Sequence, residues 1–107
     1  MRPTIKNHEY YLAEYDNVDS ACMYLYSKYD HVYDIAKKRH VLRIIFVMVD
    51  NRVNDAGLCT TRSVLHALDT LRASEEYEDR GLAREFRNLY TTLSIRYHSL
   101  MRQAGDA

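Results

Sequence analysis

The residues best suited to bind an anion form one basic cluster near the middle of the chain: Lys37, Lys38, Arg39 and His40, followed by Arg43. On a helix, Lys37 and His40 share one face at a spacing of three, and Arg39 and Arg43 share another at a spacing of four. Lysine and arginine side chains neutralise phosphate groups. This basic cluster is therefore a candidate anion-binding site.

Three tyrosines, Tyr26, Tyr29 and Tyr33, precede the basic cluster at spacings of three and four. Aromatic stacking combined with positive charge is a common way to hold a nucleotide or a single strand. The competing interpretation is a solvated, charged helix whose tyrosines line a subunit contact. We favour the second, because the 15 basic and 15 acidic residues balance and nucleic-acid modules carry a basic excess.

Two histidine–aspartate pairs have the H-x-x-D spacing that places both side chains on one face of a helix. They are His31 with Asp34, and His66 with Asp69. Each aspartate also precedes a basic residue by three or four positions, Lys38 and Arg72 respectively, and so suits an ordinary surface ion pair. The Glu-x-x-His signature of metal sites in helical bundles is absent. We predict no metal site.

No catalytic motif is present in the sequence. Nothing resembles a nucleophile elbow, a P-loop or a glycine-rich dinucleotide turn. The arginine–histidine spacing of "RSVLH", residues 62–66, is too short and too common to indicate a ribonuclease. We predict a protein that is not an enzyme and has no cofactor.

Ten tyrosines and no tryptophan supply rings that can be buried while the hydroxyl stays in water. These are more tyrosines than the interior of so small a domain can hold, and tyrosine is enriched in interface hot spots. The candidate interface residues are Tyr26, Tyr29, Tyr33, Phe46, Tyr90 and Tyr97. They favour a homodimer or higher oligomer over a monomer whose tyrosines coat the rim of its core.

The elements that must position these residues are predicted to be helices. The chain has 3 glycines and 1 proline, too few for the turns of an all-β protein. We predict an all-α fold: a three- or four-helix bundle with one long central helix, in a single domain over residues 1–107. The ends, 1–7 and 104–107, are expected to be flexible.

The most apolar stretch, Val41 to Val49, is predicted to lie in the central helix. Its β-branched residues favour a strand locally, but an isolated strand has no partners for its backbone groups, and no second stretch like it exists. A seam of apolar residues at steps of four and three leads up to it and can be continued through it. The seam comprises Val18, Cys22, Leu25, Tyr29, Val32, Ala36, Leu42, Phe46, Val49 and Val53.

Capping residues indicate where the helices begin. Asn7 is a candidate N-cap for a short first helix, although the same segment fits an extended arm equally well. Asp19 or Ser20 can cap the second helix, and Thr60 or Thr61 a later one. The later helix runs through Val64, Leu65, Leu68 and Leu71.

The last helix is predicted over residues 82–103, with Asp79 just ahead of it at the positive end of the helix dipole. Its apolar seam consists of Leu82, Phe86, Leu89, Leu93, Tyr97 and Leu100. The arginines that lie off this seam are Arg84, Arg87, Arg96 and Arg102. Residues 73–81 are expected to form a polar, acidic connection or a frayed helical extension.

Two features favour a cytoplasmic protein that is not bound to a membrane. Cys22 and Cys59 do not form a C-x-x-C pair and are typical of small buried side chains in a reducing compartment. The N-terminus lacks the apolar core of a signal peptide, and no apolar run approaches the roughly 20 residues that span a bilayer.

The favoured function is that of a non-enzymatic, oligomeric binding protein that acts through a protein partner as a regulator, adaptor or inhibitor. The alternative is a module that sequesters an anionic nucleotide ligand or nucleic acid through residues 37–40 and the nearby tyrosines. A small helical hydrolase or nuclease is third. Arginine and tyrosine on one helix fit the first two functions equally well.

Overall fold

The computed structural model describes residues 6–105 of the chain. Within that range it forms six α-helices, one 3-10 helix and no strand, so the predicted all-α class is confirmed. The described residues divide into two compact units that adjoin in sequence at Asp55 and Ala56. We name them the N-terminal unit and the C-terminal unit. The single domain over residues 1–107 stays a prediction.

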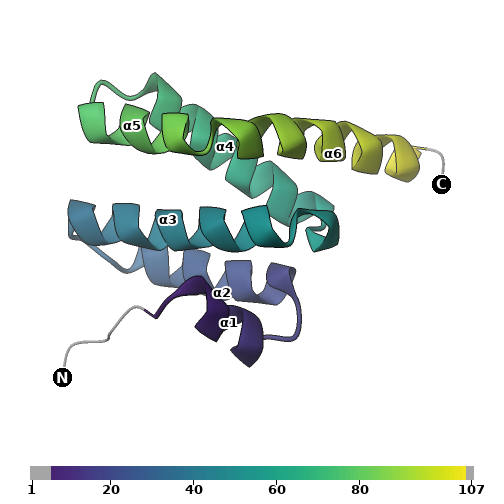
Figure 1. The fold of residues 1–107 in the computed structure, drawn as a ribbon, viewed down its shortest axis with the longest axis horizontal. Coiled ribbons are helices and arrows are strands. Elements are labelled where there is room, and N and C mark those ends of the chain that lie inside the picture. The colour runs from purple at the N-terminus through teal and green to yellow at the C-terminus, as the bar shows by residue number, and fades with distance from the viewer. Residues whose placement is uncertain (1–5, 106–107) are drawn as a thin grey trace. The chain divides into compact units, whose positions relative to one another are not determined.

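The N-terminal unit comprises α1 (His8–Glu14), α2 (Val18–Asp30), α3 (Ile35–Asn51) and the 3-10 helix η1 (Val53–Asp55). Both α1 and α2 pack against α3, and Figure 1 shows α2 running alongside α3. The first helix begins where Asn7 predicts, because the side-chain oxygen of Asn7 accepts a hydrogen bond from the backbone N–H of Tyr10.

The apolar stretch Val41 to Val49 lies within α3 and is helical, as predicted. Its buried side chains are Val41, Leu42, Ile44, Ile45, Phe46, Met48 and Val49. Each contributes about 1.5–3 kcal/mol relative to an exposed position, which outweighs the local strand preference of Val and Ile. This helix therefore carries much of the core.

The predicted seam does not run through one continuous helix. α2 ends at Asp30, and α3 begins after its N-cap Asp34, whose carboxylate accepts the backbone N–H of Lys37 at 3.1 Å. A short acidic side chain at this point satisfies a backbone donor at the start of a new helix, and it competes with continuation of the old one. The central helix is therefore shorter than the seam.

The caps of two helices differ from those we predicted. Asn17, not Asp19 or Ser20, caps α2 by accepting the backbone N–H of Ser20 at 2.8 Å. In the C-terminal unit, α4 (Leu58–Ala73) begins after Gly57, which has no side chain to cap it. The predicted caps of that helix, Thr60 and Thr61, are buried inside its first turns. The Thr61 hydroxyl is buried and has no hydrogen-bond partner among the described residues.

The C-terminal unit consists of α4, α5 (Tyr77–Glu85) and α6 (Arg87–Gly105), with α4 packed against both of the others. The predicted last helix is divided at Phe86, where φ is −105° and ψ is 29°. Figure 1 shows α5 and α6 almost in one line. Backbone hydrogen bonds continue across the division, from Phe86 to Leu82 and from Tyr90 to Phe86.

The apolar seam of the last helix faces the core in spite of this division. Leu82, Phe86, Leu89 and Leu93 are buried, while Tyr97 and Leu100 are half-buried. Asp79, predicted to lie just ahead of this helix, lies instead inside the first turn of α5, where its charge still suits the positive end of the helix dipole. The predicted acidic connection is only partly a loop, since α5 begins at Tyr77.

The expected flexible ends fall partly on residues 1–5 and 106–107, which lie outside the described residues. Inside the described range, Asn7 caps α1, and α6 extends to Gly105. None of the helices between residues 6 and 105 is both long enough and apolar enough to cross a membrane.

Candidate anion-binding site

The basic cluster lies at the start of α3. Lys37, His40 and Arg43 are exposed there, and Lys38 and Arg39 are half-buried. The Lys38 ammonium lies over the ring of Tyr29, with Nζ 4.5 Å from the ring centroid. Arg39 and Arg43 each take part in interactions of their own. Lys38, Arg39 and Arg43 thus already interact with other residues of the chain, which leaves fewer of the five basic side chains for a ligand.

The six candidate interface residues come from both units. The half-buried Tyr26 and Tyr29 lie on α2, Tyr33 follows α2, and the half-buried Tyr90 and Tyr97 lie on α6. Tyr33 is 91% exposed, whereas Phe46 on α3 is fully buried. The Tyr26 hydroxyl is buried without a hydrogen-bond partner among the described residues, and burial raises the pKa of Tyr26 above its ordinary value. Exposure therefore singles out Tyr33 among them.

Another group of tyrosines in the N-terminal unit has a structural role. The Tyr15 and Tyr24 rings stack with centroids 5.2 Å apart, and Tyr11 contacts Tyr24 at 6.0 Å. The buried Tyr11 also accepts a hydrogen bond from the backbone N–H of Lys6. Desolvation, with a smaller contribution from Tyr24, raises the pKa of Tyr15. These contacts attach α1 to α2.

A hollow of the C-terminal unit lies where α4 faces α5 and the start of α6. Its volume is about 510 Å³, within the range of small-molecule pockets. It is lined by Leu68, Arg72, Arg80, Ala83, Arg84, Arg87, Tyr90 and Thr91. We name it the arginine hollow, because four of its eight lining residues are arginines and none is acidic.

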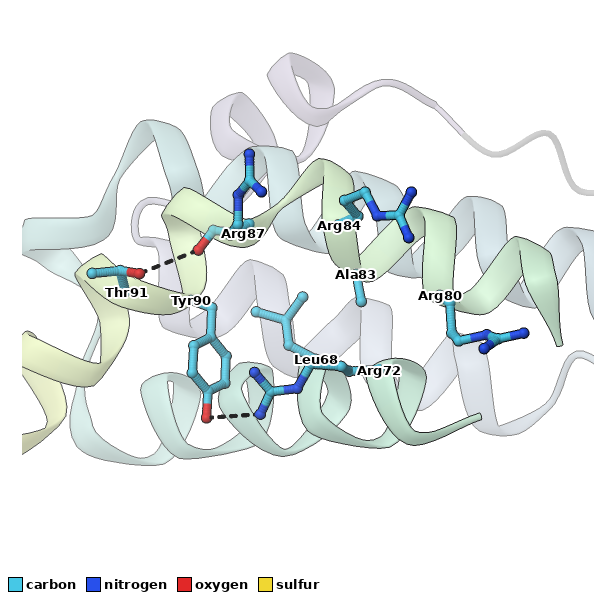
Figure 2. A pocket seen from close by; sticks show the side chains of 8 residues that line it. All are labelled: Leu68, Arg72, Arg80, Ala83, Arg84, Arg87, Tyr90 and Thr91. Carbon is cyan, nitrogen blue, oxygen red and sulfur yellow. Dashed lines mark hydrogen bonds between the residues drawn. The ribbon is translucent and has the colours of Figure 1, made fainter. Parts of the chain in front are cut away.

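Figure 2 shows how the lining side chains of the arginine hollow are arranged. Leu68 from α4 and Ala83 from α5 point into the space between the two helices. Tyr90 reaches from α6 to the tip of Arg72 on α4. Arg80 lies at the other end of the view. Arg84 and Arg87 extend from the side of α5 and α6 that is turned away from α4. The hollow thus has an apolar floor, with Arg72 toward one end and Arg80 toward the other.

Arg72 is held in place by two neighbours. Its Nη2 atom lies 2.7 Å from Oδ1 of Asp69, the surface ion pair that the sequence predicts. Its guanidinium carbon lies 4.7 Å from the centroid of the Tyr90 ring, within the distance of a cation–π contact. Nη2 also donates a long hydrogen bond of 3.5 Å to the Tyr90 hydroxyl. The Arg72 plane is therefore oriented before any ligand arrives.

The other three arginines follow one another along α5 and into α6. Arg80, Arg84 and Arg87 are spaced by four and three residues, so they lie on one side of the nearly continuous helical segment. All three are exposed. Among residues 6–105, the Arg80 side chain donates only a long hydrogen bond of 3.4 Å, to the carbonyl oxygen of Glu75. Its guanidinium thus keeps most of its donors for other partners.

A smaller hollow of about 140 Å³ adjoins the same arginines. It is lined by Tyr77, Arg80, Gly81 and Arg84. Arg80 and Arg84 line both hollows, so the two hollows share these positive charges. In the N-terminal unit, a hollow of about 370 Å³ is lined by two carboxylates, Asp16 and Asp55, and one guanidinium, Arg52, so its lining is net negative. The arginine hollow is the stronger candidate for an anion site.

From the sequence, Arg84 and Arg87 were predicted only to lie off an apolar seam. Their proximity to Arg72 and Arg80 was not predicted. One feature of the sequence does point to an anion site in this half of the chain. From residue 56 onward the chain has seven arginines and no lysine. Arginine binds carboxylates and phosphates through two parallel hydrogen bonds, which lysine does not. Acidic residues are interleaved with these arginines and cancel the net charge, so the total charge does not reveal the excess of arginine over lysine.

The aspartates of the two H-x-x-D pairs make ordinary structural contacts. Asp34 caps α3, and Asp69 pairs with Arg72. Among residues 6–105, no group of three or more His, Cys, Asp or Glu side chains is placed to hold a metal ion. Comparison of the chain with protein-family models, with curated proteins and with solved structures found no match.

Proposed function

We propose that the protein is a non-enzymatic binding protein that holds an anionic ligand in the arginine hollow. The observation that carries this proposal is the gathering of four arginines from α4, α5 and α6 around one hollow that no carboxylate lines. The sequence already suggested an anionic ligand for the alternative function, a sequestering module. In this proposal the arginine hollow replaces the basic cluster of α3 as the binding site.

The chemistry of the lining supports an oxyanion as the ligand. Hydrogen bonds between a guanidinium and a charged oxygen are about twice as strong as those between neutral groups. The buried Leu68 and the half-buried Ala83 reduce access of water to one side of the hollow, which strengthens such contacts. Arg84 and Arg87 are exposed, so their guanidinium groups stay hydrated as long as no ligand is bound.

Calorimetric titration with pyrophosphate at low ionic strength tests this proposal. We expect a Kd tighter than about 100 μM, equivalent to roughly 5.5 kcal/mol, and weaker binding as salt is added. Replacing both Arg84 and Arg87 by alanine should weaken binding by about tenfold or more, because each removes charged hydrogen bonds.

Two control variants locate the site. Arg62→Ala removes an exposed arginine of α4 outside the arginine hollow, and it should leave the affinity unchanged. Lys37→Ala combined with Arg39→Ala alters the basic cluster of α3 and should also have little effect. Loss of binding in this double variant alone would assign the anion to α3. Absence of any binding by the unmodified protein would contradict the proposal.

A second candidate function is recognition of a protein partner, as a regulator, adaptor or inhibitor. The observation that favours it is the exposure of large apolar side chains in the N-terminal unit: Tyr33 at 91%, Met23 at 73% and Ile35 at 64%. Such side chains are typical of interaction surfaces when they gather. On this proposal the protein is a cytoplasmic helical bundle that forms a homodimer or higher oligomer.

Light scattering at micromolar concentration tests the oligomer. We expect a mass of at least two chains, because two-fold pairing is the commonest way to cover exposed apolar surface. Tyr33→Ser combined with Ile35→Ser should shift the mass toward one chain. A single-chain mass over a wide range of concentration would contradict oligomerisation, and it would leave the anion site unaffected.

A further inference from the structure

We infer that the ligand of the arginine hollow is a nucleotide with more than one phosphate, in which the base stacks on Arg72 and the phosphates bind Arg80, Arg84 and Arg87. This inference rests on the proposed anion-binding function and adds the chemical class of the ligand. The evidence is that the four arginines are not equivalent in their surroundings.

Arg72 is suited to stacking rather than to neutralising charge. Its ion pair with Asp69, at 2.7 Å, offsets its positive charge and fixes one edge of the guanidinium. The guanidinium carbon lies 4.7 Å from the centroid of the Tyr90 ring. The Arg72 side chain is nevertheless 64% exposed, so the guanidinium keeps surface that a ligand can reach. A flat ring placed there would stack on the exposed part of the guanidinium.

The floor of the hollow suits the same flat group. Leu68 and Ala83 point into the space beside Arg72, as Figure 2 shows, and Leu68 is buried. A bare phosphate or pyrophosphate gains nothing from aliphatic carbon. A purine or pyrimidine base gains both the apolar contact and the stacking surface. The apolar floor therefore favours a ligand with an aromatic part.

The remaining three arginines set the number of phosphates. Arg80, Arg84 and Arg87 supply three positive charges, and the lining contains no carboxylate that would offset them. A terminal phosphate group carries about 1.5 to 2 negative charges near neutral pH, and each further phosphate adds about one. Three guanidinium groups therefore match a nucleoside diphosphate or triphosphate better than a monophosphate.

The experiment compares four ligands on the full chain: a nucleoside diphosphate, the matching nucleoside monophosphate, the free nucleoside and pyrophosphate. We expect the diphosphate to bind at least about fivefold more tightly than pyrophosphate, since stacking of one base contributes that much or more. It should also bind more tightly than the monophosphate, and the nucleoside alone should bind weakest.

Two variants separate the contributions of base and phosphate. Arg72→Lys keeps a positive charge beside Asp69 but removes the flat guanidinium, so it should weaken the diphosphate about fivefold or more and leave pyrophosphate nearly unchanged. Arg84→Ala should weaken both ligands to a similar extent. Arg62→Ala, on the same helix as Arg72, is the matched control. Circular dichroism of each variant checks that the fold is intact.

The outcomes distinguish the two proposals. If pyrophosphate binds as tightly as the diphosphate, or if Arg72→Lys weakens both equally, the nucleotide inference is wrong and the anion-binding function stands. If neither ligand binds, both are wrong. A short RNA that binds much more tightly than any mononucleotide would also overturn the nucleotide inference, because it would require a longer surface than this hollow.

Discussion

The Nε atom of Arg96 donates a hydrogen bond of 2.7 Å to the carbonyl oxygen of Ala56, a residue 40 positions earlier in the chain. Arg96 lies on α6, and the fully buried Ala56 lies just before α4. This contact joins the beginning of the C-terminal unit to its last helix. It gives a structural role to one of the arginines that lie off the apolar seam.

Arg96→Ala should therefore lower the free energy of unfolding by about 1–3 kcal/mol, because it leaves a buried carbonyl oxygen without its donor. Urea unfolding followed by circular dichroism measures the change. Arg62→Ala removes an exposed arginine of the same unit and should change stability by less than about 0.5 kcal/mol. Equal effects of the two substitutions would show that the Arg96 contact contributes little.

Ile45→Asp and Phe46→Asp should each prevent stable folding. Both side chains are fully buried in α3, and a carboxylate without a partner in an apolar site costs several kcal/mol. Circular dichroism and thermal unfolding provide the measurement. Met23→Asp, at a position of α2 that is 73% exposed, is the control and should fold normally. A variant of Ile45 that melts like the unmodified protein would contradict this assignment of the core.

Gly81→Ala should stabilise the protein by roughly 0.5–1 kcal/mol. Gly81 lies inside α5, and a Cβ atom added there meets no other atom within 4 Å. Alanine restricts the unfolded chain and favours a helix interior over glycine. Gly105→Ala, at the end of α6 and equally unobstructed, should have a smaller effect, since helix ends fray. A loss of stability in Gly81→Ala would contradict the prediction.

Stability should fall in alkaline solution because of the buried Cys22 thiol. Burial, and to a lesser degree the charge of Asp19, raises the pKa of Cys22 from its ordinary 9.0 to about 12. The folded chain thus keeps a proton that the unfolded chain releases. The resulting contribution is complete below about pH 9 and is lost as the pH rises towards 12, with a slope of about 1.4 kcal/mol per pH unit.

The Cys22→Ala variant is the control for this pH dependence. Its free energy of unfolding should fall less steeply between pH 9 and 11 than that of the unmodified chain, whatever its stability at neutral pH. Tyr26, whose pKa burial also raises, should leave some slope in the variant. Identical slopes would mean that the Cys22 thiol ionises as readily in the folded state as in the unfolded one.

The helices could be predicted because burial repeats with the helical period along this chain. Residues such as Ile45 and Leu93 mark faces that are buried in the structure. The breaks were harder to predict. At Asp34 one acidic side chain decides between continuing a helix and capping a new one. At Phe86 the apolar seam keeps its phase through the division, so periodicity alone contains no sign of it.

The caps show the same limit on a smaller scale. Asn17, Asp19 and Ser20 all suit an N-cap, so residue type alone does not select Asn17, which caps α2 in the structure. The arginine hollow was beyond reach for a different reason. It needs Arg72 and Arg84, which lie on separate helices, to face a common space. Spacing along one helix does not specify how two helices meet.

The two cysteines differ in accessibility by enough to report on motion. Cys22 is 1% exposed on α2, as predicted, whereas the burial predicted for Cys59 is wrong: Cys59 is exposed near the start of α4. A maleimide reagent should therefore modify Cys59 promptly in the native protein and reach Cys22 only when the N-terminal unit opens. The slow consumption of a second equivalent of maleimide, by Cys22, would measure how often the N-terminal unit opens. In the Cys59→Ser variant the slow reaction of Cys22 would be the only reaction observed.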